Sequence, residues 1–308
     1  MRLVSTDCLC GASRSESKLL GYVTDFEYKT TELEFAYWQC KQCGIVMPSP
    51  RPSDDDIESL YPDHYEPYQF KSLPRVVAIF RNLRERRRLT DVAEFLSERS
   101  KILDLGCGNG SFLEILRNTL PSAELAGWDF GAKVEELANK FVGIEFLPPT
   151  VEALQTYPER YNGIFALQVV EHFSDPLQIL EIIHKLLVVG GVAVIETPNC
   201  DSFDFKLFFA RHWGGYHAPR HLAIFPTKTL ERHLEQMGFT VLRKQYMTSP
   251  AFWIQSFHHY AADRGAPEIV VRLLSIKNPF LLALFVLIDG VRKLVVPTSN
   301  VRLVVQKV

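Results

Sequence analysis

A carboxylate stands just before three closely spaced glycines in the segment 101–110, which reads KILDLGCGNG. The apolar residues around Asp104 predict a buried strand, and the residues after the segment predict a helix. Gly106, Gly108 and Gly110 then form the strand-to-helix turn, where a ligand can approach bare backbone and the first helix amides. The dinucleotide fingerprint has two residues between its last two glycines, whereas this chain has one. An acid here repels a pyrophosphate and attracts an ammonium or sulfonium, so the loop predicts a cationic ligand rather than an ordinary glycine turn.

A second acid, Asp129, follows the apolar run 125–128 about 20 residues beyond the glycines, where a carboxylate can accept both hydroxyls of a ribose. Together the acids and glycines resemble the class I S-adenosylmethionine-dependent methyltransferases, whose first motif has the form DxGxGxG and whose second strand ends in such an acid. The resemblance implies S-adenosylmethionine as cofactor, with these residues binding it: Asp104, Gly106, Gly108, Gly110 and Asp129. It also implies that Gln168, at the end of the fourth strand, lies near the methionine part of the cofactor.

The resemblance extends to residues 161–172 and 186–199, which look like the fourth and fifth strands of a Rossmann-like α/β sheet of seven strands. Segment 239–243 would begin the sixth strand, and 300–308 would form the seventh, antiparallel at the edge of the sheet. Between them, residues from about 250 to 296 would form a helical insertion. Its apolar run is too short to span a bilayer. It could pack as a lid, dimerise, or lie on a membrane surface.

Four cysteines, Cys8, Cys10, Cys40 and Cys43, fall in the first fifty residues. The second pair, separated by two residues and followed by glycine, is typical of a zinc knuckle, and another pair would complete a tetrahedral structural site. The first pair is one residue short of that spacing. We therefore expect a structural zinc ion, with free cysteines packed in a small β-rich lobe as the alternative.

The expected organisation is a zinc-ribbon-like lobe at 1–50, a linker and basic helix at 51–98, and a methyltransferase domain at 99–308. This pairing resembles a bacterial subgroup related to sugar methyltransferases and to enzymes of cell-surface polysaccharide or antibiotic pathways, which implies a sugar or glycan acceptor, nucleotide- or lipid-linked. The tyrosine-rich segment 60–68 could line a substrate pocket, or be a linker whose tyrosines pack. The basic segment 75–89 could bind a phosphate, or be a solvated helix face.

Three histidines are candidates for the base that removes a proton from an acceptor hydroxyl or from a carbon beside a carbonyl. His172 follows the fourth strand, at the sheet edge where ligands bind, while His217 and His221 lie in the loop after the fifth strand and its helix. Pro219 between them predicts a loop, so we discount a helical metal pair. We expect one of the three to be catalytic, with His221 and His172 favoured and Glu171 as an outside candidate. The alternative is that the histidines only hold the loop.

The composition fits an enzyme acting on small molecules. The chain has 308 residues, 47% hydrophobic and 23% charged, which allows a sizeable core and more than one domain. Six cysteines and no apolar leader predict the cytoplasm, with contact at the inner membrane face as an option. A net charge of -2 disfavours nucleic acid as partner.

Two alternative functions remain. One is an RNA methyltransferase that uses the cysteine lobe to bind nucleic acid, and the other is a catalytically silent cofactor-binding protein. The sequence does not indicate an oligomeric state.

Overall fold

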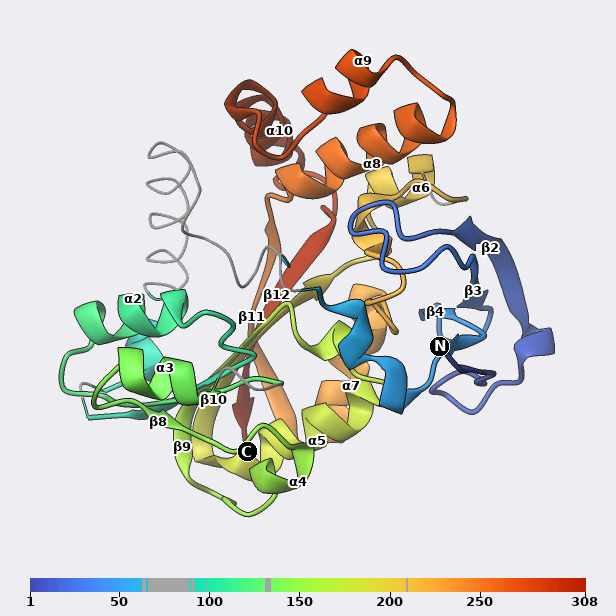
Figure 1. Cartoon of the computed structure of the whole chain (residues 1–308). Coiled ribbons are helices and arrows are strands. Elements are labelled where there is room, and N and C mark those ends of the chain that lie inside the picture. Colours follow the sequence, from blue (N-terminus) through green and yellow to red (C-terminus); the bar gives the residue numbers. More distant parts are fainter. Residues whose placement is uncertain (63–64, 66–88, 90–91, 98, 131–133, 209) are drawn as a thin grey trace.

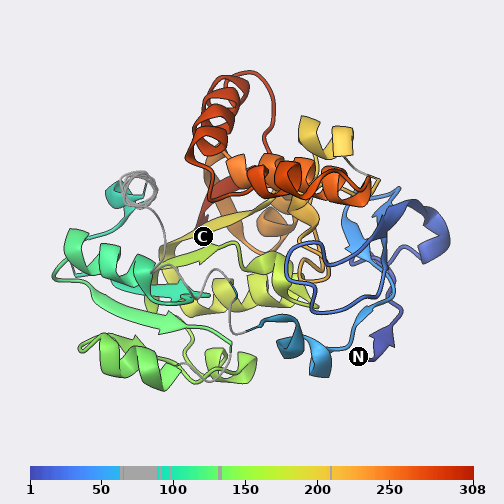
Figure 2. The same ribbon diagram turned by 45° about the horizontal axis from the view of Figure 1, so that its top comes forward.

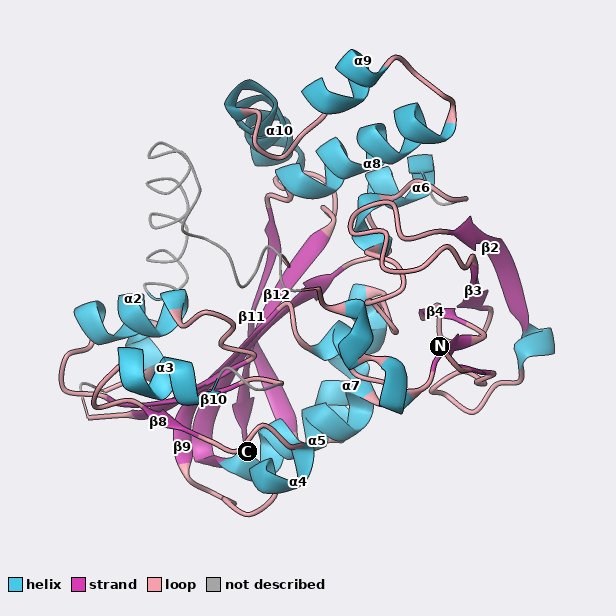
Figure 3. Ribbon diagram, viewed as in Figure 1, coloured by secondary structure: helices cyan, strands magenta, loops and turns pink. Residues whose placement is uncertain are grey.

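The computed structural model describes residues 1–62, 65, 89, 92–97, 99–130, 134–208 and 210–308. Except for Leu89, the expected basic helix at 75–89 lies outside these residues. A large sheet runs through the centre of the molecule, a small β lobe lies beside it, and a group of helices extends from one end (Figure 1). Figure 3 shows the strands of the lobe separate from those of the large sheet.

The large sheet has seven strands in the order β11-β12-β10-β9-β6-β7-β8. Their bounds are β6 Lys101–Leu105, β7 Glu124–Trp128, β8 Glu145–Phe146, β9 Tyr161–Leu167, β10 Leu187–Pro198, β11 Phe239–Met247 and β12 Asn300–Lys307. Strands β6 to β10 pair in parallel, so their carboxyl ends share one edge, and β12 is antiparallel to both of its neighbours. The Rossmann-like α/β fold expected from the sequence is confirmed.

The predicted position of β12 at the edge of the sheet was wrong, because β12 lies between β10 and β11. Its side chains are buried on both faces: Leu303 and Val305 belong to one core cluster and Val304 to another. A nearly continuous apolar run of this kind is typical of an interior strand. The charged residue in the run, Arg302, is buried and paired with Glu196 of β10 at 3.1 Å.

Helices cover the sheet and form the insertion. Their bounds are α2 Ser111–Thr119, α3 Val134–Lys140, α4 Val151–Leu154, α5 Pro176–Leu186, α6 Phe203–Phe208, α7 Thr227–Gln236, α8 Pro250–Asp263, α9 Glu268–Leu273 and α10 Pro279–Arg292. Helix α5 begins where Asp175 accepts a hydrogen bond from the Gln178 amide at 3.0 Å and proline takes the first helical position. As expected, the segment between β11 and β12 is helical. Among the described residues, no helix has both the length and the apolarity needed to span a bilayer.

The N-terminal lobe is tied to the large domain by backbone pairing. Its strands are β1 Leu3–Val4, β2 Ser17–Val23, β3 Phe35–Cys40, β4 Val46–Pro48 and β5 Arg51–Pro52. Val46 and Ile224 exchange backbone hydrogen bonds of 2.9 and 2.8 Å, so a loop of the large domain pairs with β4. The Tyr37 hydroxyl also donates to the backbone carbonyl of His221 at 3.2 Å. The lobe therefore packs directly on the loop that carries two candidate histidines.

A buried ion pair completes this joint. Arg220 and Asp25 lie 2.6 Å apart with both side chains 0% exposed. The Arg220 side chain also donates to the backbone carbonyls of Leu60 at 2.9 Å and Ala218 at 3.1 Å, and its guanidinium lies 4.5 Å from the ring centre of Tyr28. Burial alone would raise the pKa of Asp25, but the hydrogen bonds and charge of Arg220 more than offset this and lower it to about 2.

Removing one partner of this pair should be costly, because it leaves a buried charge uncompensated. We expect Arg220→Met to lower the free energy of unfolding by about 3–5 kcal/mol in urea titrations. The exposed Arg272–Glu268 pair is the matched control, and Arg272→Met should cost less than about 1 kcal/mol. Because the pKa of Asp25 is depressed, its contribution is fully present above pH about 4 and should be lost as the pH falls towards about 2. Equal effects of the two substitutions would contradict this.

Candidate functional site

The glycine loop adopts the shape that the sequence predicted. Gly106, Gly108 and Gly110 have φ angles of 80°, 53° and 76°, which is the left-handed region that favours glycine. The amide of Gly106 donates to the carbonyl of Trp128 at 2.7 Å, and the amide of Gly108 donates to the Asp129 carboxylate at 2.6 Å. The loop after β6 is thus joined to the end of β7, and the two acids expected to bind one ligand come to the same edge of the sheet.

Neither end of this loop has room for a side chain. A Cβ at Gly106 would lie 2.4 Å from Cγ2 of Val169, and a Cβ at Gly110 would lie 2.4 Å from a ring carbon of Phe141. The glycines therefore bring the backbone close both to the start of the β9–α5 connection and to the helix layer.

The loop carries a negative electrostatic field. Asp104 is 3% exposed at the tip of β6, and Asp129 is half-buried at the end of β7. Burial, followed by the charges of Asp104 and Asp129, raises the pKa of the Cys107 thiol, which lies in the same loop. This field opposes a pyrophosphate and suits a sulfonium. The residues present thus fit S-adenosylmethionine, which Asp104, the loop amides and Asp129 would hold.

Gln168 lies at the same edge, directly after β9. Its backbone is in the left-handed region, with φ of 59°, and its amide donates to the carbonyl of Glu196 at 2.7 Å. Its side-chain amide donates to Asn300 at 3.3 Å. Contact between Gln168 and the methionine part of the cofactor stays a prediction. Asn300 is a neighbour that the sequence did not indicate, because it comes from β12.

The three candidate histidines come together. The ring centres of His172 and His221 are 4.7 Å apart, those of His217 and His221 are 5.0 Å apart, and those of His172 and His217 are 6.1 Å apart. The amide of Leu222 donates to the carbonyl of Glu171 at 2.7 Å, which fastens the histidine loop to the segment after β9. The cluster therefore lies at the carboxyl edge of the sheet that also carries the cofactor loop.

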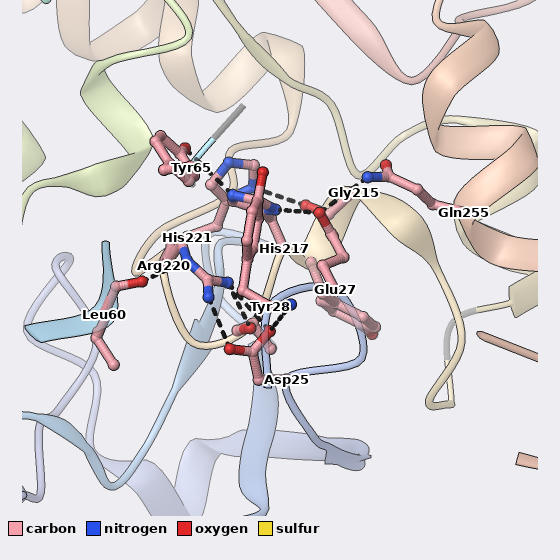
Figure 4. Close-up of polar contacts among 12 residues, drawn as sticks. Asp25, Glu27, Tyr28, Leu60, Tyr65, Gly215, His217, Arg220, His221 and Gln255 are labelled. Atoms are coloured by element: carbon pink, nitrogen blue, oxygen red, sulfur yellow. Dashed lines mark hydrogen bonds and ion pairs between the residues drawn. The ribbon is translucent and has the colours of Figure 1, made fainter. Parts of the chain in front are cut away.

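His217 has a carboxylate partner within hydrogen-bonding distance. Its Nδ1 lies 2.8 Å from Glu27, and its Nε2 lies 3.3 Å from the Tyr65 hydroxyl (Figure 4). Gln255 of α8 donates to the same Glu27 oxygen at 2.8 Å. Burial would raise the pKa of Glu27, but the charge and hydrogen bond of His217 outweigh it and the pKa is lowered. An ionised Glu27 accepts a hydrogen bond from Nδ1–H, so Nε2 is the ring nitrogen that faces the Tyr65 hydroxyl.

The other two histidines have lowered pKa values. Burial lowers the pKa of His172 to about 3, and burial also lowers that of His221 well below its usual range. Nδ1 of His221 donates to the carbonyl of Gly215 at 2.8 Å, and Nδ1 of His172 lies 2.9 Å from the Tyr61 hydroxyl. Both rings are therefore neutral at physiological pH. Which of the three histidines is catalytic stays a prediction.

Glu171 lies beneath the histidines and is fully buried. Burial raises its pKa to about 8, although it accepts a hydrogen bond from Thr197 at 3.0 Å. Its other oxygen is 3.9 Å from Nε2 of His221. Glu171, His172 and His221 each offer one donor atom, and these three atoms lie within 4.8 Å of one another. Three ligands of one metal ion would have a similar spacing.

Comparison with known proteins decides the family. A model of the methyltransferase domain matches residues 78–244, more than half of the chain. The chain belongs to this methyltransferase-domain family. A tRNA U34 carboxymethyltransferase of Campylobacter hominis is 31% identical over 147 residues, covering 45% of this chain and 50% of that protein. A ubiquinone biosynthesis O-methyltransferase of Pectobacterium carotovorum is 30% identical over 105 residues, covering 32% and 43%.

The chain spans about half the length of the curated relatives it matches. Among solved structures, a protein proposed to be a sarcosine dimethylglycine methyltransferase, from Galdieria sulphuraria, superposes with a TM-score of 0.50 at 14% identity, covering 76% of this chain and 87% of that one. At 14% identity, this similarity shows the fold alone. The family establishes S-adenosylmethionine as the cofactor class that the loop geometry also fits.

The four cysteines of the N-terminal lobe form one cluster. Sγ of Cys8 is 3.4 Å from Sγ of Cys43, and Sγ of Cys10 is 3.6 Å from Sγ of Cys40. Four thiolates about 2.3 Å from a tetrahedral zinc ion would be about 3.8 Å apart, so the cluster could bind zinc with little movement. The shorter first knuckle is accommodated because Gly11 turns with φ of 84°.

The cysteine cluster packs against the start of α7. The carbonyl of Cys43 accepts a hydrogen bond from Thr229 of α7 at 2.6 Å, and a Cβ at Gly44 would lie 2.8 Å from Pro226. A closed four-thiolate site has no open position for substrate, so its role would be structural.

Zinc binding can be tested by metal content. We expect one zinc ion per chain, lost in Cys40→Ser, since three thiolates and a serine hydroxyl bind zinc much more weakly. Cys200→Ala is the matched control, because Cys200 is buried beside the cluster but outside it. Two ions per chain, one of them lost in Glu171→Gln, would assign a second metal to the histidine cluster. Zinc-free protein as stable as the native protein would contradict a structural role.

The role of Asp129 can be tested by cofactor binding. Asp129→Ala removes both the carboxylate placed for the ribose and its hydrogen bond to Gly108. Hydrogen bonds to charged groups are worth about 1.5–3 kcal/mol, so affinity for S-adenosylmethionine and S-adenosylhomocysteine should fall roughly 10- to 150-fold by calorimetry. Glu152→Gln, at an exposed site on α4, should leave affinity unchanged. If the Asp129 variant bound the cofactor as tightly as the native protein does, the ribose would have to bind at another site.

Proposed function

We propose that this methyltransferase acts on a hydroxyl group of a small molecule, and that a sugar or glycan, nucleotide- or lipid-linked, is its acceptor class. The observation that carries the proposal is the His217–Glu27 pair, 2.8 Å apart at the edge of the sheet that holds the cofactor loop. Methyl transfer to a hydroxyl needs a proton acceptor, and an imidazole paired with a carboxylate is a suitable one.

When bound, S-adenosylmethionine supplies a methyl group on a positively charged sulfur. The chain has to hold the acceptor oxygen in line with that methyl group and keep water out, which accounts for much of the rate. Nε2 of His217 would take the proton of the acceptor hydroxyl, while the methyl carbon exchanges its bond to sulfur for a bond to the acceptor oxygen and the sulfur keeps the electron pair. Glu27 then stabilises the imidazolium through Nδ1, as an orienting carboxylate does in other histidine-based sites.

The side chains around the pair suit a sugar ring. Tyr65 lies with its ring centre 5.2 Å from that of Tyr28 and 5.0 Å from that of Tyr61. Aromatic faces pack on the apolar sides of a sugar while hydroxyls and imidazoles bind its edges. Tyr61 and Tyr65 come from the tyrosine-rich segment that the sequence singled out.

RNA is the second acceptor class, and a specific observation favours it: one matched relative is a tRNA carboxymethyltransferase. Other matched relatives are ubiquinone O-methyltransferases, whose names point to a small molecule instead. The net charge of -2 supports the small-molecule proposal, because phosphate backbones bind through clustered cations.

The test is transfer of labelled methyl from S-adenosylmethionine into fractionated extract, with Asp129→Ala protein as the blank. We expect label in the nucleotide-sugar or lipid-glycan fraction. We expect His217→Asn to lower kcat about 10²- to 10⁴-fold with cofactor affinity unchanged, since asparagine tolerates the left-handed backbone at this position, where φ is 41°.

His212→Asn is the matched control, because His212 pairs with Asp263 at 2.8 Å outside the cluster and should keep full activity. Label in RNA would overturn the small-molecule proposal, and full activity of His217→Asn would remove His217 as the base. Label no higher than the blank in every fraction would favour a catalytically silent protein.

A further inference from the structure

Helix α10 has two apolar faces, and the described chain covers one of them. On the covered face, Phe285 stacks on Trp253 of α8 with ring centres 5.5 Å apart. Asp289 on the same face accepts hydrogen bonds from Trp253 at 3.0 Å and from the amide of Ser249 at 2.7 Å. These contacts fix how α10 lies on α8. They leave the opposite face of α10 pointing away from the rest of the insertion.

The second face is exposed and strongly apolar. Phe280 is 84% exposed and Leu287 is 70% exposed, at a spacing of seven residues that keeps them on one side of α10, and Leu294, just after the helix, is 79% exposed. Of the twenty-three exposed large apolar side chains among the described residues, eleven fall between 269 and 296. They form what we name the α9–α10 apolar surface: Ile269, Val270, Leu273, Phe280, Leu284, Val286, Leu287, Val291, Leu294, Val295 and Val296.

The charges around this surface are mainly positive, in contrast to a chain with a net charge of -2. Residues 264–296 contain five basic and two acidic side chains. Both acids are neutralised locally: Glu268 pairs with Arg272 at 2.6 Å, and buried Asp289 pairs with Arg292 at 2.9 Å. Three cations then have no acidic partner among the described residues: Arg264, Lys277 and Lys293.

We propose that the α9–α10 apolar surface docks on an anionic lipid bilayer. Helices with an apolar face and flanking cations lie in the membrane interface, where apolar burial and attraction to anionic lipid act together. A second copy of the chain fits less well, because its surface would bring the same cations together. The surface is also wider than a helix-pairing seam, since it continues from α9 through Leu294–Val296.

Docking would bring the bilayer close to the histidine cluster. Helix α8 lies between α10 and the histidine loop and packs against both (Figure 2). Its Gln255 donates to Glu27, and its Ser256 accepts a hydrogen bond from the amide of Gly214 at 2.8 Å. One helix therefore separates the proposed lipid contact from the His217–Glu27 pair.

The test is cosedimentation of the full chain with vesicles, which needs neither cofactor nor acceptor and so is independent of the proposed function. We expect binding to phosphatidylcholine vesicles containing phosphatidylglycerol, weaker binding to phosphatidylcholine alone, and release by salt. Leu287→Gln with Leu294→Gln should weaken binding at least about tenfold. Lys277→Gln with Lys293→Gln should weaken it roughly fivefold per lysine.

Matched controls separate this surface from general stickiness. Val142 and Val189 are 83% and 70% exposed but lie elsewhere, so Val142→Gln with Val189→Gln should leave binding unchanged, as should Lys185→Gln. All substituted side chains are exposed, and circular dichroism would verify the fold. Absence of vesicle binding, or equal loss in the control variants, would overturn the proposal. So would a lipid-free dimer abolished by Leu287→Gln with Leu294→Gln, which would assign the surface to a second copy.

Discussion

The buried ion pair between Arg220 and Asp25 is the constraint on which the candidate site depends. It joins positions 195 residues apart, and neither partner reaches solvent. Arg220 lies between His217 and His221 in the chain, and Asp25 lies two residues before Glu27. Holding these two points together therefore also sets the distance between the His217 ring and its carboxylate. A loop with little regular backbone pairing gains a fixed geometry because one guanidinium donates to the loop carbonyl of Ala218, to the carbonyl of Leu60 and to the Asp25 carboxylate of the lobe.

The N-terminal lobe is consequently part of the candidate site. It supplies Glu27 to the histidine cluster, it pairs β4 with the loop at Ile224, and its cysteine cluster supports the start of α7. In this arrangement a zinc ion would act at a distance from the chemistry, by keeping the lobe rigid enough to hold one carboxylate in place. For that structural role, the lobe would not have to bind an extended partner such as a nucleic acid.

Local motifs were predictable from the sequence, and long-range neighbours were not. The loop from Asp104 to Gly110 and the Cys40–Cys43 knuckle are contiguous, so steric and ligand preferences of a few residues determine them. The His217–Glu27 pair joins positions 190 residues apart, and its acid lies in a segment without regular periodicity. The place of β12 depended on which strand it would pair with, which apolar alternation alone does not specify. Similarly, the apolar sequence of α10 indicated an apolar helix but not which of its faces would stay exposed.

The interior position of β12 has a consequence for synthesis of the chain. Strand β11 pairs with β12 and with no other strand of the described sheet, and the two are separated by the helices α8 to α10. When the ribosome has made β11, its pairing edge has to wait until residues 300–307 emerge. During that interval an open strand edge and the exposed side chains of α9 and α10 are present together, which is the combination that invites aggregation. Engagement of those helices during that interval, by a chaperone or another surface, would cover their apolar side chains.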